Sequence, residues 1–591
     1  MTNKPIDFYR RRLKELEKEL QQLRQRSQRI VTVRLITVIV AIAVGVFSYN
    51  QDWLEIGAVV IAVIFGAFLW QIKRHNALKS LVKNIENLLL INTSELKAIE
   101  GDFSDFENGL QLIDFDHRNL YDLDLFGKKS LFQRLNRTTT TEGKTALSEF
   151  IKKQDGNNLS QLKELHQELA AEVLWRQDFQ SVGMLAPKNK GYQELKSWFE
   201  EKPVLLGNRA LKIISQFSPF AFVAILILYF VSIIPQWVPV VYFFAHLGII
   251  GIKVKDINAL HSQLSKKQNN LDAYAGLLDS LAKANFKNAK LNDLKARATG
   301  GFSSINQLKR LINLLDSRLN LIMGIVLNGA FLWDYRLVFQ IEKWKKEQAS
   351  KLEDWISIIA ATETHCSLGN YVFNHPDFVW PKETQEVLVK AEDLAHPFLQ
   401  TNGRVANDFE LDPKGQVVLL SGANMSGKST FLRTVGLNLI MAKVGLPVCA
   451  KSFIFKSVPV YTSMRINDSL QESESYFFAE LKRLKFIMDT IKRGDEIFIL
   501  MDEILRGTNS NDKHKGSAGL IKQLIALNTS GIVASHDITL SALENEYPNK
   551  LLNRSFEVEN EDGELVFDYK LREGVCQNLN ASYLMEKMGI V

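Results

Sequence analysis

A glycine-rich loop, placed between an apolar run and a helix-compatible segment, constrains this chain more than any other feature of its sequence. The apolar run is Val417–Leu420, and the pattern G-x-x-x-x-G-K-S follows from Gly422 to Ser429. The next segment, Thr430–Lys443, is compatible with a helix. Strand, glycine loop and helix in this order are the context of a phosphate-binding loop. The sequence therefore predicts an α/β domain with a P-loop.

Each residue type in this loop has a physical reason to contact phosphate. Gly422 and Gly427 let the backbone turn so that its N–H groups converge on phosphate oxygens, and the helix N-terminus adds partial positive charge. Lys428 can reach the β- and γ-phosphates, and the Ser429 hydroxyl can bind Mg²⁺. We therefore expect ATP and Mg²⁺ here, and we assign nucleotide binding to Gly422, Asn424, Gly427, Lys428, Ser429 and Thr430.

Two further apolar runs end in the polar residues that a nucleotide hydrolase needs. Ile497–Met501 reads as a buried parallel strand, and Asp502 and Glu503 follow it. We expect Asp502 to hold Mg²⁺, directly or through water, and Glu503 to orient or deprotonate the attacking water. The run Gly531–Ser535 ends at His536. For this histidine we prefer a γ-phosphate sensor to the structural role that an isolated histidine more often has.

These segments resemble the ATPase motifs of the MutS family of DNA mismatch-repair proteins. The resemblance covers Gly-Ala-Asn-Met-Ser-Gly-Lys-Ser-Thr, Asp502–Thr508 and Ala534–His536, and Ser475–Leu481 is similar to the family's S-T-F-x-x-E-[ML] segment. It implies an ABC-class ATPase in which Ser475 reaches the γ-phosphate bound by the other chain of a homodimer. Leu505 departs from the family, which usually has Gly there, but the magnesium and water ligands are untouched. The transporter-type L-S-G-G-Q signature is absent from the sequence, which argues against an ordinary ABC transporter.

Two pairs of apolar runs predict transmembrane helical hairpins. The first pair is Leu35–Tyr49 and Leu54–Ile72, and the second is Ile213–Ile234 and Trp237–Ile252. About 20 apolar residues span the hydrocarbon core of a bilayer. Lys and Arg cluster at the open ends of both hairpins, so the ATPase and both termini are expected in the cytoplasm. We expect an integral protein of a bacterial inner membrane that contacts lipid; the alternative is two buried core hairpins.

A fifth apolar run, Leu319–Trp333, needs a separate interpretation. It contains Asn320 and Asn328 and is bracketed by Arg318 and Asp334. A fifth span would place the P-loop outside the cytoplasm, away from ATP. We therefore expect this run to form a buried core helix.

The rest of the chain has helical patterns that resemble the MutS lever domain. Leu135–Gly143 is similar to the family's L-x-R-T-x-T-x-x-G segment, and Asn258–Ala284 and Ser304–Ser350 resemble its levers. The predicted fold is an α/β P-loop ATPase domain of the ABC class, MutS-like, joined to an all-α lever domain, with two transmembrane hairpins. The expected divisions are a basic amphipathic helix (1–30), hairpin 1 (31–74), a cytoplasmic linker and the start of the helical core (75–210), hairpin 2 (211–255), the lever domain (256–394) and the ATPase domain (395–591).

The sequence leaves two functions open. Net charge is only +6, so no global basic field points to nucleic acid, and DNA binding rests on family analogy. Residues 1–120 show no counterpart of the family's mismatch-reading domain with its Phe-x-Glu wedge, so any DNA binding is expected to be indifferent to mismatches. The first function is a membrane-anchored ATPase that acts on DNA, and the alternative is a membrane-embedded ATP-driven switch that does not bind it. The three cysteines, Cys366, Cys449 and Cys576, lack metal-ligand spacing and indicate reduced thiols inside a cell.

Overall fold

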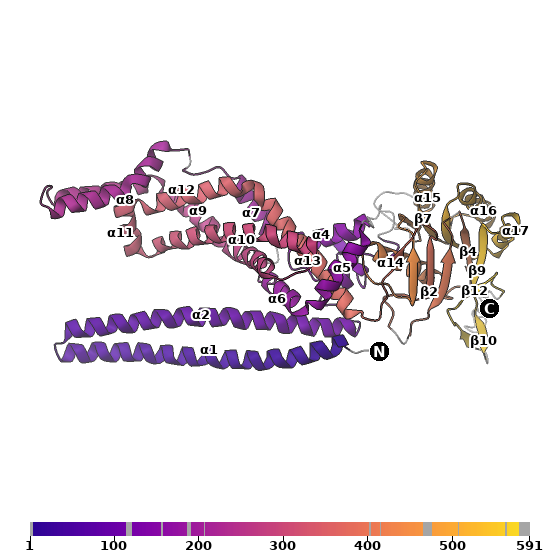
Figure 1. Ribbon diagram of the computed structural model, residues 1–591, viewed down its shortest axis with the longest axis horizontal. Helices are drawn as coiled ribbons and strands as arrows, with labels where there is room; N and C mark the ends of the chain where they lie inside the picture. Colours follow the sequence, from indigo (N-terminus) through magenta and orange to yellow (C-terminus); the bar gives the residue numbers. More distant parts are fainter. Residues whose placement is uncertain are drawn as a thin grey trace.

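The protein is elongated, with an α/β region at one end and the tips of two helical hairpins at the other (Figure 1). The computed structural model describes residues 4–113, 121–154, 158–185, 191–205, 207–400, 403–413, 415–464, 476–505, 508–561 and 564–577. The predicted combination of an all-helical N-terminal region with a mixed α/β C-terminal region is confirmed.

The first hairpin consists of α1 (Lys4–Asn50) and α2 (Leu54–Ile99), which pack side by side along most of their length. Both helices are continuous because neither contains a proline after its first turn, and Pro5 at the start of α1 is compatible with a helix N-terminus. Residues 51–53 join the two helices, whereas the sequence predicted the turn one position earlier, at residues 50–52. The expected divisions at 30 and 74 do not coincide with helix ends, and residues 75–99 continue α2 instead of forming a linker.

The second hairpin consists of α8 (Arg209–Phe230) and α9 (Trp237–Lys283). Within the described part of the chain, four helices are long and apolar enough to cross a membrane, and at most 11% of each apolar window is buried. They are α1, α2, α8 and the Trp237–Gln268 part of α9. Both hairpin tips lie at the same end of the molecule (Figure 1), which is the arrangement that a single flat bilayer would require.

Most of the central helices pack around a shared apolar core, whereas the first two, Leu131–Leu135 and Thr141–Lys153, pack on the core of the α/β region. The segments before the second hairpin are α3 (Leu131–Leu135), α4 (Thr141–Lys153), α5 (Leu159–Ala171), α6 (Val173–Gly183) and α7 (Gly191–Glu200). Those after it are α10 (Ala289–Leu315), the 3₁₀ turn η2 (Asp316–Leu319), α11 (Leu321–Phe331), α12 (Trp333–Gln348) and α13 (Leu352–Asn374). The core includes Leu165, Phe179, Leu277, Trp344 and Trp355.

Two predictions for this region are wrong. Ser304–Ser350 is not one lever, because the chain bends by 110° between α10 and α11 and turns again at Leu332, whose φ is +48°. Nor is Leu319–Trp333 a buried core helix, since Leu321 and Ile322 are 74% and 76% exposed. The reason is that α11 lies across the ends of α10 and α12 (Figure 1), with burial confined to its C-terminal half at Asn328, Gly329 and Ala330.

The C-terminal region is built on a six-stranded sheet with the order β12-β9-β4-β8-β7-β6. Its inner strands are parallel and read as unbroken apolar runs because helices cover both faces. The strands are β4 (Val417–Gly422), β6 (Val460–Ser463), β7 (Phe498–Asp502), β8 (Ser530–Ala534), β9 (Leu551–Phe556) and the antiparallel edge β12 (Leu571–Glu573). The helices are α14 (Lys428–Lys443), α15 (Tyr476–Lys492), α16 (Ser510–Ala526) and α17 (Leu543–Glu546).

A second sheet lies beside the first and has the order β1-β5-β2-β3. Its strands are β1 (Lys382–Glu383), β2 (Val389–Leu394), β3 (Asn407–Leu411) and β5 (Ser452–Phe455), and a separate small ladder joins β10 (Glu559–Glu561) to β11 (Glu564–Val566). Between β2 and β3 the chain passes along the wall of the candidate site described next.

Candidate nucleotide site

The glycine loop connects β4 to α14, as the sequence predicted. Gly422 has a φ of +152° and Gly427 a φ of +108°. A Cβ atom at Gly422 would lie 2.8 Å from the carbonyl oxygen of Phe556, and one at Gly427 would lie 3.1 Å from the ring of Tyr569. Both positions therefore require glycine, both for the backbone conformation and for the space.

Lys428 is buried at the first turn of α14. Its Nζ donates hydrogen bonds to the carbonyl oxygens of Gly422 and Ala423, at 2.7 Å and 2.8 Å. The ammonium is thus held against the backbone of the loop, beside the amino end of a helix that carries its own partial positive charge. Both features favour an anion at this place.

Ser429, in the first turn of α14, meets Asp502, at the end of β7. The Ser429 hydroxyl donates to Oδ2 of Asp502 at 2.5 Å, while Oδ1 of Asp502 is buried and has no hydrogen-bond partner among the described residues. An unpaired buried carboxylate oxygen is costly, and a cation would satisfy it. Mg²⁺ fits this donor set, because it is usually held by one or two protein oxygens and completed by phosphate and water.

No group of three or more His, Cys, Asp or Glu able to hold a metal occurs in the described ranges. Ser429 and Asp502 therefore suit an ion that arrives with a phosphate better than one held by protein ligands alone. The assignment of Ser429 and Asp502 as its protein ligands stays a prediction.

Glu503 and His536 are brought together because β7 and β8 are neighbours. Asp502 pairs with Ala534 in the sheet register, so the residues that follow the two strands emerge at the same edge. Nε2 of His536 lies 2.5 Å from Oε1 of Glu503, and the Glu503 N–H donates to the carbonyl oxygen of Ala534 at 3.0 Å. Glu503 has a φ of +48°, a conformation that costs a non-glycine residue about 1–2 kcal/mol.

Leu505 also has a left-handed backbone, with a φ of +62°. Glycine, the residue usual in the MutS family at this place, adopts this conformation without steric cost. Leu505 is buried, and its N–H donates to Oε1 of Glu480 at 2.5 Å. The departure from the family pattern therefore falls on a strained position two residues after Glu503.

A cavity of about 430 Å³ opens over the loop. The sequence predicted one wall, which includes Asn424, Thr430 and Glu503, but not the opposite wall, which includes His396, Val405, Asn407 and Tyr569. Asn407 fixes that wall, since its Nδ2 donates to the Tyr569 carbonyl at 3.0 Å and its Oδ1 accepts from the Leu571 N–H at 2.8 Å.

His396 faces this cavity as a neutral imidazole. Burial, and then the positive charges of Arg134, Arg433 and Arg404, lower the pKa of His396 to about 4. A neutral ring at the rim can stack or accept a hydrogen bond without repelling a cation. Ser475 lies outside the described residues, so its contact across a dimer stays a prediction.

Comparison with known proteins finds similarity to MutS proteins in the C-terminal part of the chain. The family model named MutS domain V matches residues 418–588. The DNA mismatch repair protein MutS of Thermotoga neapolitana is 32% identical over 243 residues, which cover 41% of this chain and 30% of that protein. MutS protein homolog 4 of Mus musculus is 29% identical over 244 residues, or 39% of this chain and 24% of that protein. The chain thus spans less than a third of the length of these relatives.

The fold and the matched segment define a protein with a helical N-terminal region and a mixed α/β C-terminal region that contains a MutS domain V. Both the family model and the identity to MutS support membership of the chain in the MutS family.

Proposed function

We propose that this protein is a membrane-anchored, MutS-like P-loop ATPase that hydrolyses ATP to ADP and phosphate in a homodimer. The observation that carries the proposal is the contact between Ser429 and Asp502 at the base of the glycine loop. The Ser429 hydroxyl and the buried ammonium of Lys428 line one cavity, and the partly unpaired buried carboxylate of Asp502 accepts from that hydroxyl. Such a cluster is expensive to bury without a polyphosphate and its cation.

Few groups of the protein take part in the proposed hydrolysis of ATP. The loop N–H groups and Lys428 hold the β- and γ-phosphates, and Mg²⁺ would neutralise charge that develops on them. Glu503 accepts a proton from water as the water oxygen bonds to the γ-phosphorus and the bond to the bridging oxygen of ADP breaks. His536, already in contact with Glu503, holds that carboxylate in place and meets the γ-phosphate. Ser475 of the second chain completes the site.

The exposed apolar surfaces of α1, α2, α8 and α9 support membrane anchoring. A water-soluble protein rarely exposes apolar patches of this extent. The flanking Lys and Arg favour a topology with both hairpin tips outside and the α/β region in the cytoplasm, in a bacterial inner membrane. Lipid is then the first partner of the chain.

The residues at the end of the first hairpin contact the segment that forms one wall of the nucleotide cavity, which favours the switch as a second candidate function. Gln400, on the segment that lines the cavity, donates to the carbonyl oxygen of Glu100 at the end of α2 at 3.3 Å. The Arg134 guanidinium lies 4.5 Å from the ring centroid of Phe103 and 4.4 Å from that of Phe398. A change in this segment on nucleotide binding would therefore act on α2, an unbroken helix to the hairpin tip.

Action on DNA is supported by the names of the relatives, which are DNA mismatch-repair proteins. We propose DNA contact through the helical levers and phosphate groups, without mismatch recognition. The test is binding of matched and mismatched duplexes by the full-length protein in lipid nanodiscs, at low and high salt, with and without ATP. Phosphate contacts predict salt-sensitive binding of equal strength to both duplexes.

Each outcome of that test separates the candidates. Clear preference for the mismatched duplex would contradict the proposed non-specific contact. Absence of binding to either duplex at low salt would reject action on DNA and leave the ATP-driven membrane switch. The Lys428→Ala variant serves as the matched control that separates ATP-dependent from ATP-independent binding.

A further inference from the structure

The short helix α11 exposes an apolar surface that nothing in the proposed ATPase cycle uses. Between Arg318 and Asp334 the sequence contains no charged residue. The large side chains exposed there are Leu319, Leu321, Ile322, Met323, Ile325 and Val326. Six apolar side chains next to one another in water would be an aggregation hazard, so their surroundings need an explanation.

Contacts with the second hairpin fix the depth of α11. Gly329 of α11 lies directly against the ring of Phe243 on α9, and ten residues of α9 separate Phe243 from Lys253. At 1.5 Å per residue, α11 lies about 15 Å nearer the hairpin tip than this lysine.

The other helix of the hairpin gives the same depth independently. Phe331 packs edge-on against Phe222 of α8, with ring centroids 5.4 Å apart. Ten residues separate Phe222 from Lys212, which is again about 15 Å along the helix. If the two lysines mark the cytoplasmic headgroup layer, α11 lies below it, within the hydrocarbon.

Several polar groups at the two ends of α11 have partners inside the protein, as hydrocarbon favours, while Nη1 of Arg318 and Oδ1 of Asp334 have no hydrogen-bond partner among the described residues. Asn320 caps the first turn by accepting from the Met323 N–H at 3.1 Å. Asn328 donates to the Gly324 carbonyl at 2.9 Å and accepts from the Asp334 N–H at 2.9 Å. The two charges that bracket the run, on Arg318 and Asp334, form a buried ion pair at 3.2 Å.

We propose that α11 is a membrane-inserted helix that enters the cytoplasmic leaflet and does not cross the bilayer. Lipid acyl chains cover the exposed apolar face of α11. The inference rests on the proposed membrane anchoring. With 11 residues, α11 is about 16 Å long, roughly half of what a hydrocarbon core of about 30 Å requires.

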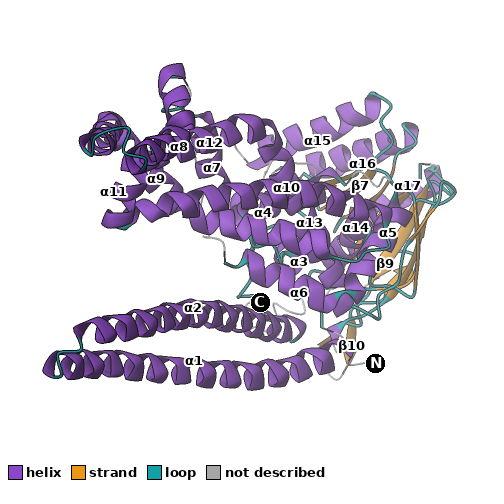
Figure 2. Cartoon of the chain, turned by 60° about the vertical axis from the view of Figure 1, so that its left-hand side comes forward, coloured by secondary structure: helices purple, strands orange, loops and turns teal. Residues whose placement is uncertain are grey.

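The place of α11 favours lipid over a protein partner. Both views of the molecule put α11 beside α8 and α9 (Figures 1 and 2), and the contacts agree. The two hairpin helices that α11 contacts also expose large apolar side chains, such as Phe220 and Phe244. A bilayer around the hairpin would therefore meet α11 without any change of structure. Because α10 and α12 connect it to the central helices, α11 also ties the lever region to the membrane.

The test places a polarity-sensitive fluorophore on single added cysteines of the full-length protein in liposomes of phosphatidylcholine and phosphatidylglycerol. The native cysteines are buried, so an added surface cysteine reacts selectively. The sites are Ile322→Cys and Val326→Cys on α11, Ile39→Cys on the first hairpin, and Lys343→Cys on the charged face of α12. Fluorescence is quenched either from the lipid, by nitroxide-bearing acyl chains, or from the water, by iodide.

Labels at Ile322 and Val326 are expected to lose most of their fluorescence to the lipid nitroxide and little to iodide, and the Lys343 label is expected to behave in the opposite way. Quenching of both α11 labels by iodide alone would overturn the proposal. Protection from both quenchers would overturn it as well, because α11 would then be covered by a second copy or another protein. If the Ile39 label also escaped the lipid quencher, the membrane anchoring itself would be wrong.

Discussion

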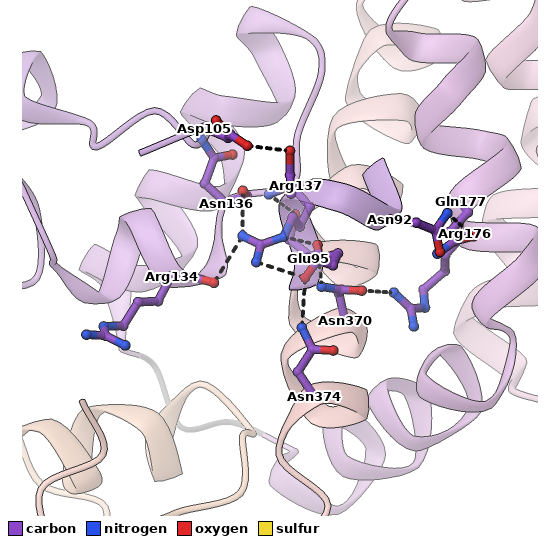
Figure 3. Close-up of polar contacts among 12 residues, drawn as sticks. Asn92, Glu95, Asp105, Arg134, Asn136, Arg137, Arg176, Gln177, Asn370 and Asn374 are labelled. Carbon is purple, nitrogen blue, oxygen red and sulfur yellow. Dashed lines mark hydrogen bonds and ion pairs between the residues drawn. The ribbon is translucent and has the colours of Figure 1, made fainter. Parts of the chain in front are cut away.

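Arg137 and Glu95 form a buried ion pair that attaches the first hairpin to the helical core (Figure 3). Nη2 of Arg137 lies 3.2 Å from Oε2 of Glu95, which also accepts from Nδ2 of Asn374 at 2.8 Å. Tyr9 of α1 donates to Oδ1 of the same asparagine at 2.9 Å. The bases of α1 and α2 are therefore both attached to α13 through one polar cluster.

Removing one side of this pair is expected to be costly. Glu95→Ala leaves the Arg137 guanidinium buried without its counter-charge, which should lower the free energy of unfolding by about 3–5 kcal/mol. The matched control is Glu86→Ala on the same helix, since Glu86 pairs with Arg24 at the surface at 2.9 Å and should matter by about 1 kcal/mol or less. Denaturant unfolding of both variants in detergent compares them. Equal losses in the free energy of unfolding would mean that the buried Arg137–Glu95 pair stabilises the attachment no more than a surface ion pair does.

A pair of buried histidines predicts acid sensitivity. Nε2 of His166 lies 3.2 Å from Nδ1 of His365, and Nδ1 of His166 lies 2.8 Å from the Gly445 carbonyl oxygen. Burial lowers the pKa of His166 to about 4 and that of His365 well below its usual range.

The unfolded chain binds protons at a pKa of about 6.5, so these histidines stabilise the fold fully above that pH and less as pH falls toward about 4. The loss at pH of about 5 should be roughly 2 kcal/mol for His166. Unfolding midpoints measured at several pH values check this. Between neutral and acid pH, the His166→Gln variant is expected to lose less stability than the wild type, whatever its stability at neutral pH. An identical loss in the two proteins would show that His166 is not the cause of the acid sensitivity.

Parts of the site could be predicted because their signals are local. Asp502 and His536 directly follow apolar strands, and parallel strands bring such residues to one edge. The wall formed by His396 and Tyr569 could not be predicted, since the two come from segments far apart in the chain that meet only through packing and through Asn407. Glu503 carries strain that no residue pattern encodes.

The error at α11 has a physical cause as well. An apolar run between two opposite charges is compatible both with a protein core and with a membrane. Neither interpretation predicts the Arg318–Asp334 pair, because these residues lie on either side of α11 and meet only where the chain bends by 110°. Periodicity alone does not separate the two environments.

Mixed dimers test the shared site. If Ser475 acts across the dimer, chains carrying Lys428→Ala and chains carrying Ser475→Arg should together regain part of the ATPase activity that each lacks alone. One site of the mixed dimer then has an intact loop and an intact serine. Co-expression with two different tags, followed by tandem purification, isolates that dimer. Lack of rescue in verified mixed dimers would argue for a site built within one chain.

Topology can be read from thiol labelling in intact cells. A cysteine placed at Gln51, in the exposed tip of the first hairpin, should react with a membrane-impermeant thiol reagent. A cysteine at Lys513 on α16 should react only after the cells are opened. Each Lys or Arg beside the cytoplasmic leaflet gains about 1 kcal/mol from anionic lipid, which is the reason for this orientation. The reverse labelling pattern would place the α/β region outside and contradict a cytoplasmic ATPase.

The central claim is that Lys428 and Glu503 have separate roles in binding and hydrolysing ATP. It is tested most directly by measuring ATP binding and single-turnover hydrolysis with the full-length protein in nanodiscs. Lys428→Ala should lose ATP binding, because the buried charge that faces the phosphates is gone. Glu503→Gln should bind ATP like the wild type but hydrolyse it about 10²–10⁴ times more slowly, as expected when a general base is removed. Hydrolysis by Glu503→Gln at the wild-type rate would contradict the account.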